Sequence, residues 1–278
     1  MITRIPARFP ACLAAAVLAA TALDCRAVEP LDTFSARLGG YITDFDTKVR
    51  ADGQTDDGTR IDLERDLGLD QSNTVAMAGL SWRPWEKHEF GLAYYRDSAD
   101  AHRQIDRDIE FDGEVYETSS TVRADLDLDA YDIYYVYWGL DRDSWVMGPR
   151  LGLVWYSIGL DLELEVDANG NPVGSGSVSS SVSADLPAPS IGGSWRWVPG
   201  GSDWRLSADV GYFAADIDNI DADVTFGRFG VEWFPWENWG ASLDYTLRRI
   251  DADADRTSFD GNFRFVDSGL RLGVVYRF

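Results

Sequence analysis

The chain is poor in the residues on which several chemistries depend. Its two cysteines, Cys12 and Cys25, both fall within the first 27 residues, so a chain that loses this segment has no disulfide or thiol chemistry. It contains only two histidines, so few residues could serve as the catalytic histidine on which the nucleophilic sites of most hydrolases depend. Beyond residue 28 no apolar run approaches the length of a transmembrane helix, so entry into a membrane would require strands.

Positive charge is also scarce. The 25 Lys and Arg residues stand against 47 Asp and Glu, which gives a formal net charge of -22. Phosphate binding needs clustered Lys and Arg, so nucleic acid is not expected as a partner. The run from Asp167 begins like a calcium-binding loop, but Pro172 stands where glycine is required and no Glu occupies the twelfth position. We therefore expect no metal site and no cofactor.

The N-terminal segment has the pattern of a cleaved secretory signal. Two arginines precede an apolar run over 11–23, and small residues follow near Ala27. A lipid anchor on Cys25 is disfavoured, because Asp24 stands where a small residue is expected. The expected boundaries are a signal peptide over 1–27 and a single domain over 28–278.

The C-terminal residues SGLRLGVVYRF alternate in character. Counting back from Phe278, positions 276, 274, 272 and 270 are apolar, whereas Arg277 and Arg271 fall on the other face. This two-residue period predicts a strand. Similar alternation occurs over 34–42, 74–83, 88–96, 145–156, 187–197, 204–213, 227–233 and 239–248.

One segment does not fit a single phase. Over 131–140, Asp132 and the pair Leu126 and Leu128 demand opposite faces unless a bulge intervenes. Together the segments predict roughly ten antiparallel strands. Eight or twelve stay open, because 58–84 is long enough for a bend or another hairpin.

The connections fall into two sets. One set is short and the other is long, polar and rich in Asp, as expected of the two ends of a transmembrane barrel. The short set covers 84–88, 140–144, 199–203 and 235–238, and the long set covers 46–58, 100–118, 165–184, 216–223 and 251–261.

Tryptophan concentrates at the short connections, as in EWFPWENWG over 232–240 and WRPWEKHEF over 82–90. Of the eleven tryptophans, only Trp155 lies away from them. Indole suits a membrane–water boundary, because its ring is apolar and its N–H is polar. The predicted girdle consists of Trp82, Trp85, Trp138, Trp145, Trp195, Trp197, Trp204, Trp233, Trp236 and Trp239.

A soluble β-sandwich would share the alternation, but it would not explain why indoles gather at one kind of turn. The sequence therefore predicts an all-β protein that forms a closed antiparallel transmembrane β-barrel.

The C-terminal VVYRF, taken with the signal and the girdle, resembles Gram-negative outer-membrane β-barrel proteins. The stretch GTRIDLERDLGLD over 58–70 is similar to one in barrels without an assigned function. The resemblance implies export to the cell outer membrane and a porin-like fold, and it implies no activity. It also implies that the barrel-assembly machinery recognises the last strand, where the matching positions are Val274, Tyr276 and Phe278.

The strand phases place a set of charged side chains inside the barrel. Two interpretations stay open: an ion-pair network that fills a narrow lumen, or an arginine-lined constriction that favours anions. The predicted lumen residues are Arg37, Arg83, Arg150, Arg196, Arg205, Arg228, Arg248 and Arg271, with Glu89, Asp209, Glu232 and Asp244 as partners.

Three functions follow in order of preference. The first is a non-enzymatic structural or surface-interaction barrel, whose acidic outer segments contact outer-membrane lipids and lipopolysaccharide, with divalent cations as a bridge. The second is a narrow, anion-preferring channel for small solutes. The third is an outer-leaflet lipid-modifying enzyme or protease. It requires His102 within hydrogen-bond reach of a Ser or carboxylate at the lipid-facing rim, since Ser98, Asp100 and His102 share a face but stand too far apart.

Overall fold

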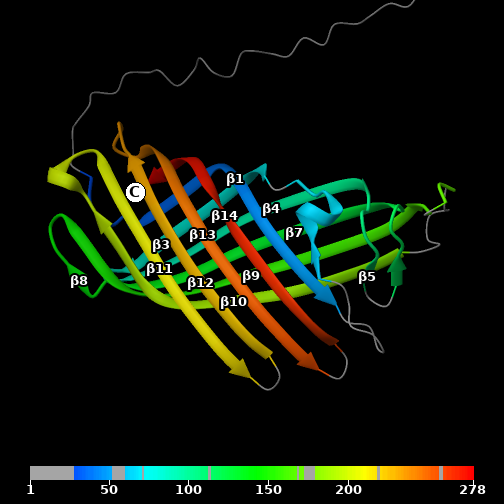
Figure 1. Cartoon of the computed structure of the whole chain (residues 1–278). Coiled ribbons are helices and arrows are strands. Elements are labelled where there is room, and N and C mark those ends of the chain that lie inside the picture. The colour runs from blue at the N-terminus through cyan, green and yellow to red at the C-terminus, as the bar shows by residue number, and fades with distance from the viewer. Residues whose placement is uncertain are drawn as a thin grey trace, which may run out of the picture.

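The chain folds into a closed antiparallel barrel of ten strands (Figure 1), which confirms the expected fold class. The computed structural model describes residues 28–51, 60–70, 72–111, 114–167, 169–171, 179–217, 220–256 and 259–278, so the expected signal peptide lies outside the described residues. The barrel strands are β1 (Phe34–Ala51), β3 (Ser72–Trp85), β4 (His88–Gln104), β7 (Thr121–Tyr137), β9 (Trp145–Val166), β10 (Ser179–Trp197), β11 (Trp204–Ile217), β12 (Ile220–Trp233), β13 (Trp239–Arg256) and β14 (Phe259–Arg277).

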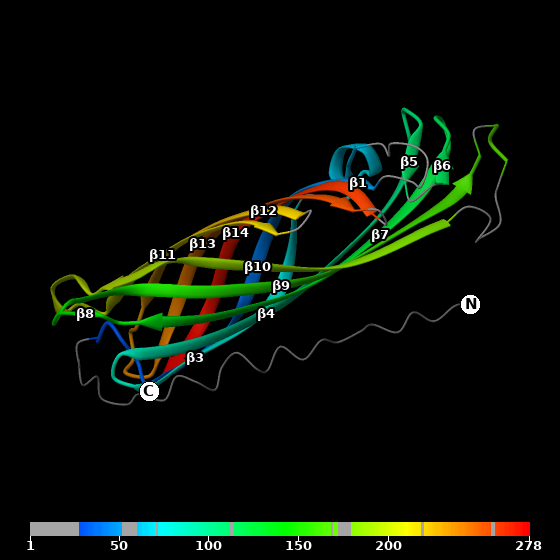
Figure 2. The same cartoon turned by 90° about the horizontal axis from the view of Figure 1, so that it is seen from below.

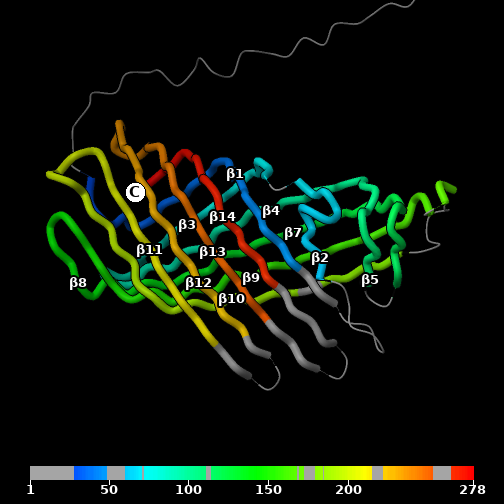
Figure 3. Tube along the Cα trace, in the orientation of Figure 1, coloured from blue at the N-terminus to red at the C-terminus, as the bar shows by residue number. Residues whose placement is uncertain are grey.

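Each barrel strand pairs with the next one in the chain, and β14 closes the barrel by pairing with β1 from Ser35↔Arg277 onwards. In the trace of Figure 3 the red β14 lies beside the blue β1. Within the described residues, no helix is long and apolar enough to cross a membrane. The short elements are β2 (Ile61–Asp62), η1 (Leu63–Leu67), β5 (Ile109–Phe111), β6 (Glu114–Tyr116), β8 (Leu140–Asp141) and η2 (Pro199–Gly201).

The outer surface carries an apolar belt, because alternate residues of each strand point away from the lumen. Large exposed side chains of this belt include Leu38, Leu80, Leu92, Ile133, Leu151, Val210, Phe229, Leu243 and Leu272. Such a surface is stable against lipid and not against water.

The two ends of the barrel differ. At one end the connections after β3, β7, β10 and β12 are short, as the sequence predicts, and in outer-membrane barrels this end faces the periplasm. At the other end, the prediction of long loops over 216–223 and 251–261 is wrong. There β11 and β12 pair as far as Ile217↔Ile220, and β13 and β14 as far as Arg256↔Phe259. The reason is that a run such as DADAD itself has the two-residue period of a strand.

The outer connections after β4 and β9 are also shorter than predicted, since strand structure continues into them, whereas the connection after β1 extends to Ser72 and is longer than the predicted 46–58. The longest strand is β9, with 22 residues, whereas β3 has only 14. Figure 2 shows β7 and β9 reaching, with the β5–β6 hairpin, toward the outer end. The barrel wall is therefore higher on the side formed by β4, β7 and β9.

The ambiguous phase of β7 has a simple solution. Leu128 and Val136 are both buried, and Asp132 between them forms ion pairs with interior arginines, so all three point into the lumen. The strand needs no bulge at this position, because the interior becomes apolar toward the outer end.

Candidate functional site

Interior ion pairs fill the periplasmic half of the lumen. Arg205 Nε lies 2.6 Å from Glu232 Oε2, and Arg228 Nη2 lies 2.5 Å from Asp209 Oδ2. Both pairs join residues that face each other directly across β11 and β12. Arg37 of β1 contacts the same Glu232 from across the barrel. Charge-assisted pairs that link separate strands in this way fix the lumen side chains in place.

A second cluster centres on Glu89 of β4. Arg196 binds it with both terminal nitrogens, at 2.5 and 2.9 Å, and the Trp138 indole donates to Glu89 Oε2 at 3.2 Å. The Tyr134 hydroxyl donates to Glu89 Oε1 at 3.3 Å. Gly91 makes room for this ring, because a Cβ at Gly91 would lie 2.1 Å from Tyr134 ring atoms.

The remaining predicted lumen residues fall into place around these pairs. Arg150 and Arg248 lie 3.6 and 3.2 Å from Asp132, and Asp244 lies 3.3 Å from Arg37. Arg83 differs, because it binds backbone carbonyls at the periplasmic mouth. The structure buries Arg150, Arg205, Arg248, Arg271, Glu89, Asp209, Glu232 and Asp244, and leaves Arg37, Arg83, Arg196 and Arg228 partly buried.

A layer of tyrosines around Asp267 closes the middle of the barrel. Tyr41 donates to Asp267 Oδ1, and Tyr95 and Tyr156 donate to Oδ2 at 2.6 and 2.8 Å. The three rings come from β1, β4 and β9, so this carboxylate joins opposite walls. Sequence reasoning missed Asp267. Extending the C-terminal alternation inward from Arg271 would have placed it in the lumen.

Above this layer the interior is apolar. Inward side chains of β4, β7 and β9 pack into a buried cluster whose members include Ala101, Val122, Ala124, Leu160, Leu162 and Leu164. The β5–β6 hairpin adds Ile109 and Tyr116 to the cluster. This apolar outer half was not predicted, because the sequence analysis assigned only charged residues to the lumen.

A short segment over 60–70, here called the cap, completes the apolar cluster. It fills a gap in the wall, because β3 begins at Ser72 opposite Asp44 while β1 continues outward and pairs there with β2. The one-turn helix η1 begins after Asp62, whose side chain accepts from Arg65 N, and ends at Gly68 with φ 79°. Glycine adopts this left-handed conformation without strain.

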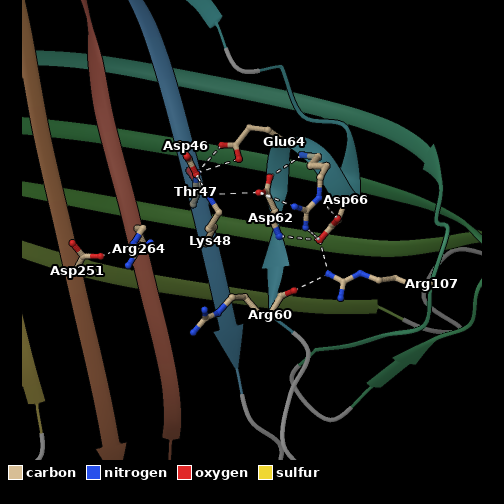
Figure 4. Close-up of polar contacts among 11 residues, drawn as sticks. Asp46, Thr47, Lys48, Arg60, Asp62, Glu64, Asp66, Arg107, Asp251 and Arg264 are labelled. Atoms are coloured by element: carbon tan, nitrogen blue, oxygen red, sulfur yellow. Dashed lines mark hydrogen bonds and ion pairs between the residues drawn. The ribbon is translucent and has the colours of Figure 1, made fainter.

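The cap is held by apolar packing and by polar contacts, and Figure 4 shows the polar contacts. Its Leu63, Leu67 and Leu69 are buried in the apolar cluster. Both carboxylate oxygens of Glu64 accept from the Thr47 backbone N–H, at 3.0 and 3.1 Å, and Asp66 Oδ2 lies 2.5 Å from Arg107 Nη2. The segment 58–70 that the sequence analysis singled out is thus, over its described residues 60–70, a part of the barrel wall that packs onto the apolar cluster.

Two carboxyl groups of the cap have shifted pKa values. Burial raises the pKa of Glu64 above its ordinary value, although the Thr47 N–H opposes the shift. Burial acts the same way on Asp66, but hydrogen bonds from Arg65, the Asp62 backbone and Arg107 hold the pKa of Asp66 below its ordinary value. The surroundings of the cap therefore stabilise the charged form of Asp66 and destabilise the charged form of Glu64.

The predicted girdle needs one correction. Trp138 is fully buried in the lumen, with Arg196 stacked 4.9 Å from its ring centroid, because it continues the inward phase of β7. The Trp145 and Trp195 rings are partly buried. The other predicted members are exposed at the periplasmic end: Trp82, Trp85, Trp197, Trp204, Trp233, Trp236 and Trp239.

A second set of aromatic residues marks the outer boundary. The Tyr94 hydroxyl donates to Asp129 at 2.6 Å, and the Tyr212 hydroxyl donates to Asp223 at 2.7 Å. Trp155, the one tryptophan away from the short turns, donates to Asp185 at 3.3 Å. Each aromatic residue lies at the edge of the apolar belt and hydrogen-bonds a carboxylate on the neighbouring strand. The sequence analysis missed this set because it followed tryptophan alone.

The residues of the assembly motif point outward. Val274, Tyr276 and Phe278 are exposed, and the Phe278 backbone exchanges hydrogen bonds of 2.9 and 3.0 Å with Phe34. They are thus accessible on the lipid-facing side of the strand that closes the barrel.

His102 lies on the outer surface of β4. Its Nδ1 is 3.2 Å from Glu165 Oε2, which is the carboxylate contact that an enzymatic function required. Among the described residues, no serine or threonine hydroxyl is hydrogen bonded to His102. No group of three or more His, Cys, Asp or Glu side chains is placed to hold a metal ion in the described part of the chain.

Comparisons with known proteins support the fold and go no further. No family model matches the chain, and no curated protein does. Among solved structures, the outer membrane protease OmpT from Escherichia coli is similar with a TM-score of 0.59 and 12% identity, over 88% of this chain and 96% of that one.

Two further barrels are more distant. The toluene transporter TodX from Pseudomonas putida has a TM-score of 0.36 and 9% identity, over 89% of this chain and 90% of its own. The attachment invasion locus protein Ail of Yersinia pestis has a TM-score of 0.33 and 11% identity, over 89% of this chain and 100% of its own. These likenesses are too weak to bear on activity. What the comparisons establish is the architecture of an outer-membrane β-barrel, and that fold indicates the outer membrane as the location.

Proposed function

We propose that this protein is a non-enzymatic outer-membrane barrel with a closed lumen, whose role is structural or surface-interacting. One observation carries the proposal: side chains occupy the lumen at each level along its length, apart from one small cavity among the arginines. Ion pairs occupy the periplasmic half, the Asp267 tyrosine layer follows, and the apolar cluster with the cap fills the outer half. A barrel filled by its own side chains acts as a scaffold.

The raised wall gives this scaffold an external surface. On the outward face of β4, β7 and β9, Asp100, Asp125 and Asp161 are direct neighbours across three strands. Arg123 lies 2.7 Å from Asp125 and so offsets part of the negative charge. The surface is hydrophilic and acidic, which suits exposure to water above the lipids and contact with cation-bridged lipopolysaccharide.

Planar-bilayer recording of the folded chain tests the closed lumen. We expect no steady conductance steps from bilayers that contain verified folded protein. Steady anion-selective steps would instead support the second function, a narrow anion-preferring channel. That alternative has some support, because five arginines line a cavity in the lumen. The double variant Arg150→Ala, Arg248→Ala serves as a comparison, since it removes two arginines from the middle of the barrel.

Catalysis by the His102–Glu165 pair is the third function. Both side chains are exposed on the outer wall, so a surface ion pair is the simpler interpretation. Mass spectra of outer-membrane lipids should be the same in cells that express the wild type and cells that express His102→Gln. A lipid species that appears only with the wild type would make this barrel an enzyme.

We also propose that the C-terminal strand is the assembly signal. Removing Phe278 should lower the amount of barrel in the membrane more than it lowers the stability of barrels that have folded. Normal membrane levels of the truncated chain would count against this role.

A further inference from the structure

A small cavity lies among the arginines of the periplasmic half. Its volume is about 60 Å³, which is room for several water molecules. Small residues, including Ser35, Gly79 and Ser81, leave the space unfilled. The charged part of the lining is mostly basic: Arg37, Arg196, Arg205, Arg228 and Arg271 line the cavity, and Glu232 is the one acidic residue there.

Most of this charge is already compensated. Arg196 pairs with Glu89, Arg228 with Asp209, and Arg205 with Glu232. Arg37 also contacts Glu232. The carboxylate that lines the cavity is therefore bound on both oxygens by arginines, and it presents little free negative charge to the space.

Arg271 is the exception. It is only 5% exposed, its Nε has no hydrogen-bond partner, and no described carboxylate forms an ion pair with it. The strand register places Asp244 directly opposite, but Asp244 turns to Arg37 instead, at 3.3 Å. The guanidinium is held in position by the rings of Tyr41 and Tyr95, at 4.6 and 5.9 Å from their centroids.

An unpaired buried guanidinium is costly, because it has lost water without gaining an acceptor. Arg37 Nε is also buried without a partner, although the terminal nitrogens of Arg37 bind Glu232 and Asp244. Arg271 and Arg37 both line the one cavity, together with the hydroxyl groups of Ser35, Ser81 and Ser207.

One of the Ser35 and Ser81 hydroxyls donates to the other at 2.7 Å, and both oxygens of the lining carboxylate Glu232 are bound by arginines. Asp244 Oδ1 is also buried without a partner, but Asp244 does not line the cavity. The lining thus offers more N–H and O–H donors than free acceptors around a space of a few water molecules.

We propose that this cavity binds a small inorganic anion, of the size of chloride or a compact oxyanion such as phosphate, with Arg271 as its principal ligand. The anion would supply the missing acceptor and complete the interior network. This site does not depend on the proposed scaffold role, because a silent barrel and a conducting one can both hold a bound anion.

Thermal unfolding of the full chain, folded in detergent micelles, tests the proposal. Sodium gluconate, whose anion is too large for the cavity, is compared with sodium chloride and sodium phosphate at equal ionic strength. For the wild type, saturating chloride or phosphate should raise the apparent Tm by roughly 5–10 °C over gluconate. Which salt acts at the lower concentration distinguishes chloride from an oxyanion.

The variant Arg271→Met should lose this shift and, in gluconate, should be at least as stable as the wild type, because it no longer buries an unpaired charge. Arg96→Met is the matched control, since Arg96 forms an exposed ion pair outside the barrel, and it should keep the full shift. If Arg271→Met does not fold, Arg271→Lys replaces it and should show a reduced shift. Equal wild-type Tm in all three salts, or an undiminished shift in the Arg271 variant that folds, overturns the proposal.

Discussion

The two halves of the lumen are filled by different kinds of interaction. The periplasmic half is filled by arginines and carboxylates whose partners come from distant parts of the chain, as in the Arg196–Glu89 pair. The outer half is filled by aliphatic side chains, and its closing segment is a local excursion between β1 and β3. An ion-pair network depends on each partner, whereas apolar packing depends on volume and tolerates substitution more gradually. The two halves should therefore respond differently to single substitutions.

The largest effect is expected in the periplasmic half. Glu89→Ala leaves Arg196 buried without its carboxylate and removes the acceptor of Trp138, so it should cost about 3–5 kcal/mol in the free energy of unfolding. Equilibrium unfolding in urea measures this change. The double variant Glu89→Leu, Arg196→Met should recover most of the loss, because no unpaired charge is left.

The control for this prediction is an exposed pair of the same type. Asp127→Ala breaks the ion pair with Arg96 on the outer surface and should cost at most about 1 kcal/mol. If Glu89→Ala costs no more than Asp127→Ala, the interior pairs are solvated and the lumen is not closed there.

The second effect concerns the cap. Leu67→Ala removes a buried side chain from the apolar cluster, which typically costs about 2–5 kcal/mol. Since the cap is a short segment on the barrel wall, we expect much of this loss as local opening, with the barrel midpoint less affected. Hydrogen exchange over 60–70 should accelerate strongly in the variant, whereas exchange in β13 should not change. Leu140→Ala, at an exposed short connection, is the control. Equal acceleration in β13 would show that cap and barrel unfold as one unit.

The contrast between the halves also explains what sequence reasoning could reach. The period of two predicted the barrel and the inward phase of arginines such as Arg205 and Arg228, because their strands alternate clearly. It could not identify the partner of each arginine, since the Arg196–Glu89 contact depends on the closure of the barrel. It misjudged Trp138, because proximity to a turn does not specify which face a ring occupies.

The apolar outer half and the cap were harder to predict for a further reason. In β7, the alternation places Leu128 and Asp132 on one face, and a rule that reserves the lumen for polar residues rejects that phase. The cap lies in the wall only because β3 is short, and strand length is set by pairing with neighbours. Arg271 was equally hard to predict. The strand register places Asp244 directly opposite it, but in the structure Asp244 binds Arg37 instead.

The third effect is a pH dependence of the cap. The raised pKa of Glu64 means that its contribution to stability is present below its ordinary pKa of 4.5 and is lost as pH rises through the folded-state value. Asp66 acts in the opposite sense. Its lowered pKa contributes stability above 3.8, which is lost as pH falls through the folded-state value. The pH dependence of cap stability can be measured by trypsin cleavage at the cap arginines, Arg60 and Arg65, with digestion after brief exposure to each pH.

Protection should therefore be greatest at mildly acidic pH and should decline toward neutral pH. Glu64→Gln keeps an acceptor for the Thr47 N–H and removes the charge, so its protection should no longer decline between these conditions. A wild-type cap whose protection does not change between mildly acidic and neutral pH would show that the charged form of Glu64 is fully accommodated.

The smallest effect belongs to the outer boundary, which lies between the apolar belt and the acidic wall. Tyr94→Phe removes the hydroxyl that donates to Asp129 and keeps the ring in the lipid, so it should cost about 0.5–1.5 kcal/mol in lipid vesicles. Tyr212→Phe, which loses the bond to Asp223, should behave alike. Trp204→Phe at the periplasmic end is the comparison, since no described carboxylate accepts from its ring and only headgroup contacts are lost. If the tyrosine variants lose no more stability than Trp204→Phe does, the outer carboxylates are solvated by water. The aromatic residues would then hold the barrel in the membrane through their rings, as at the periplasmic end.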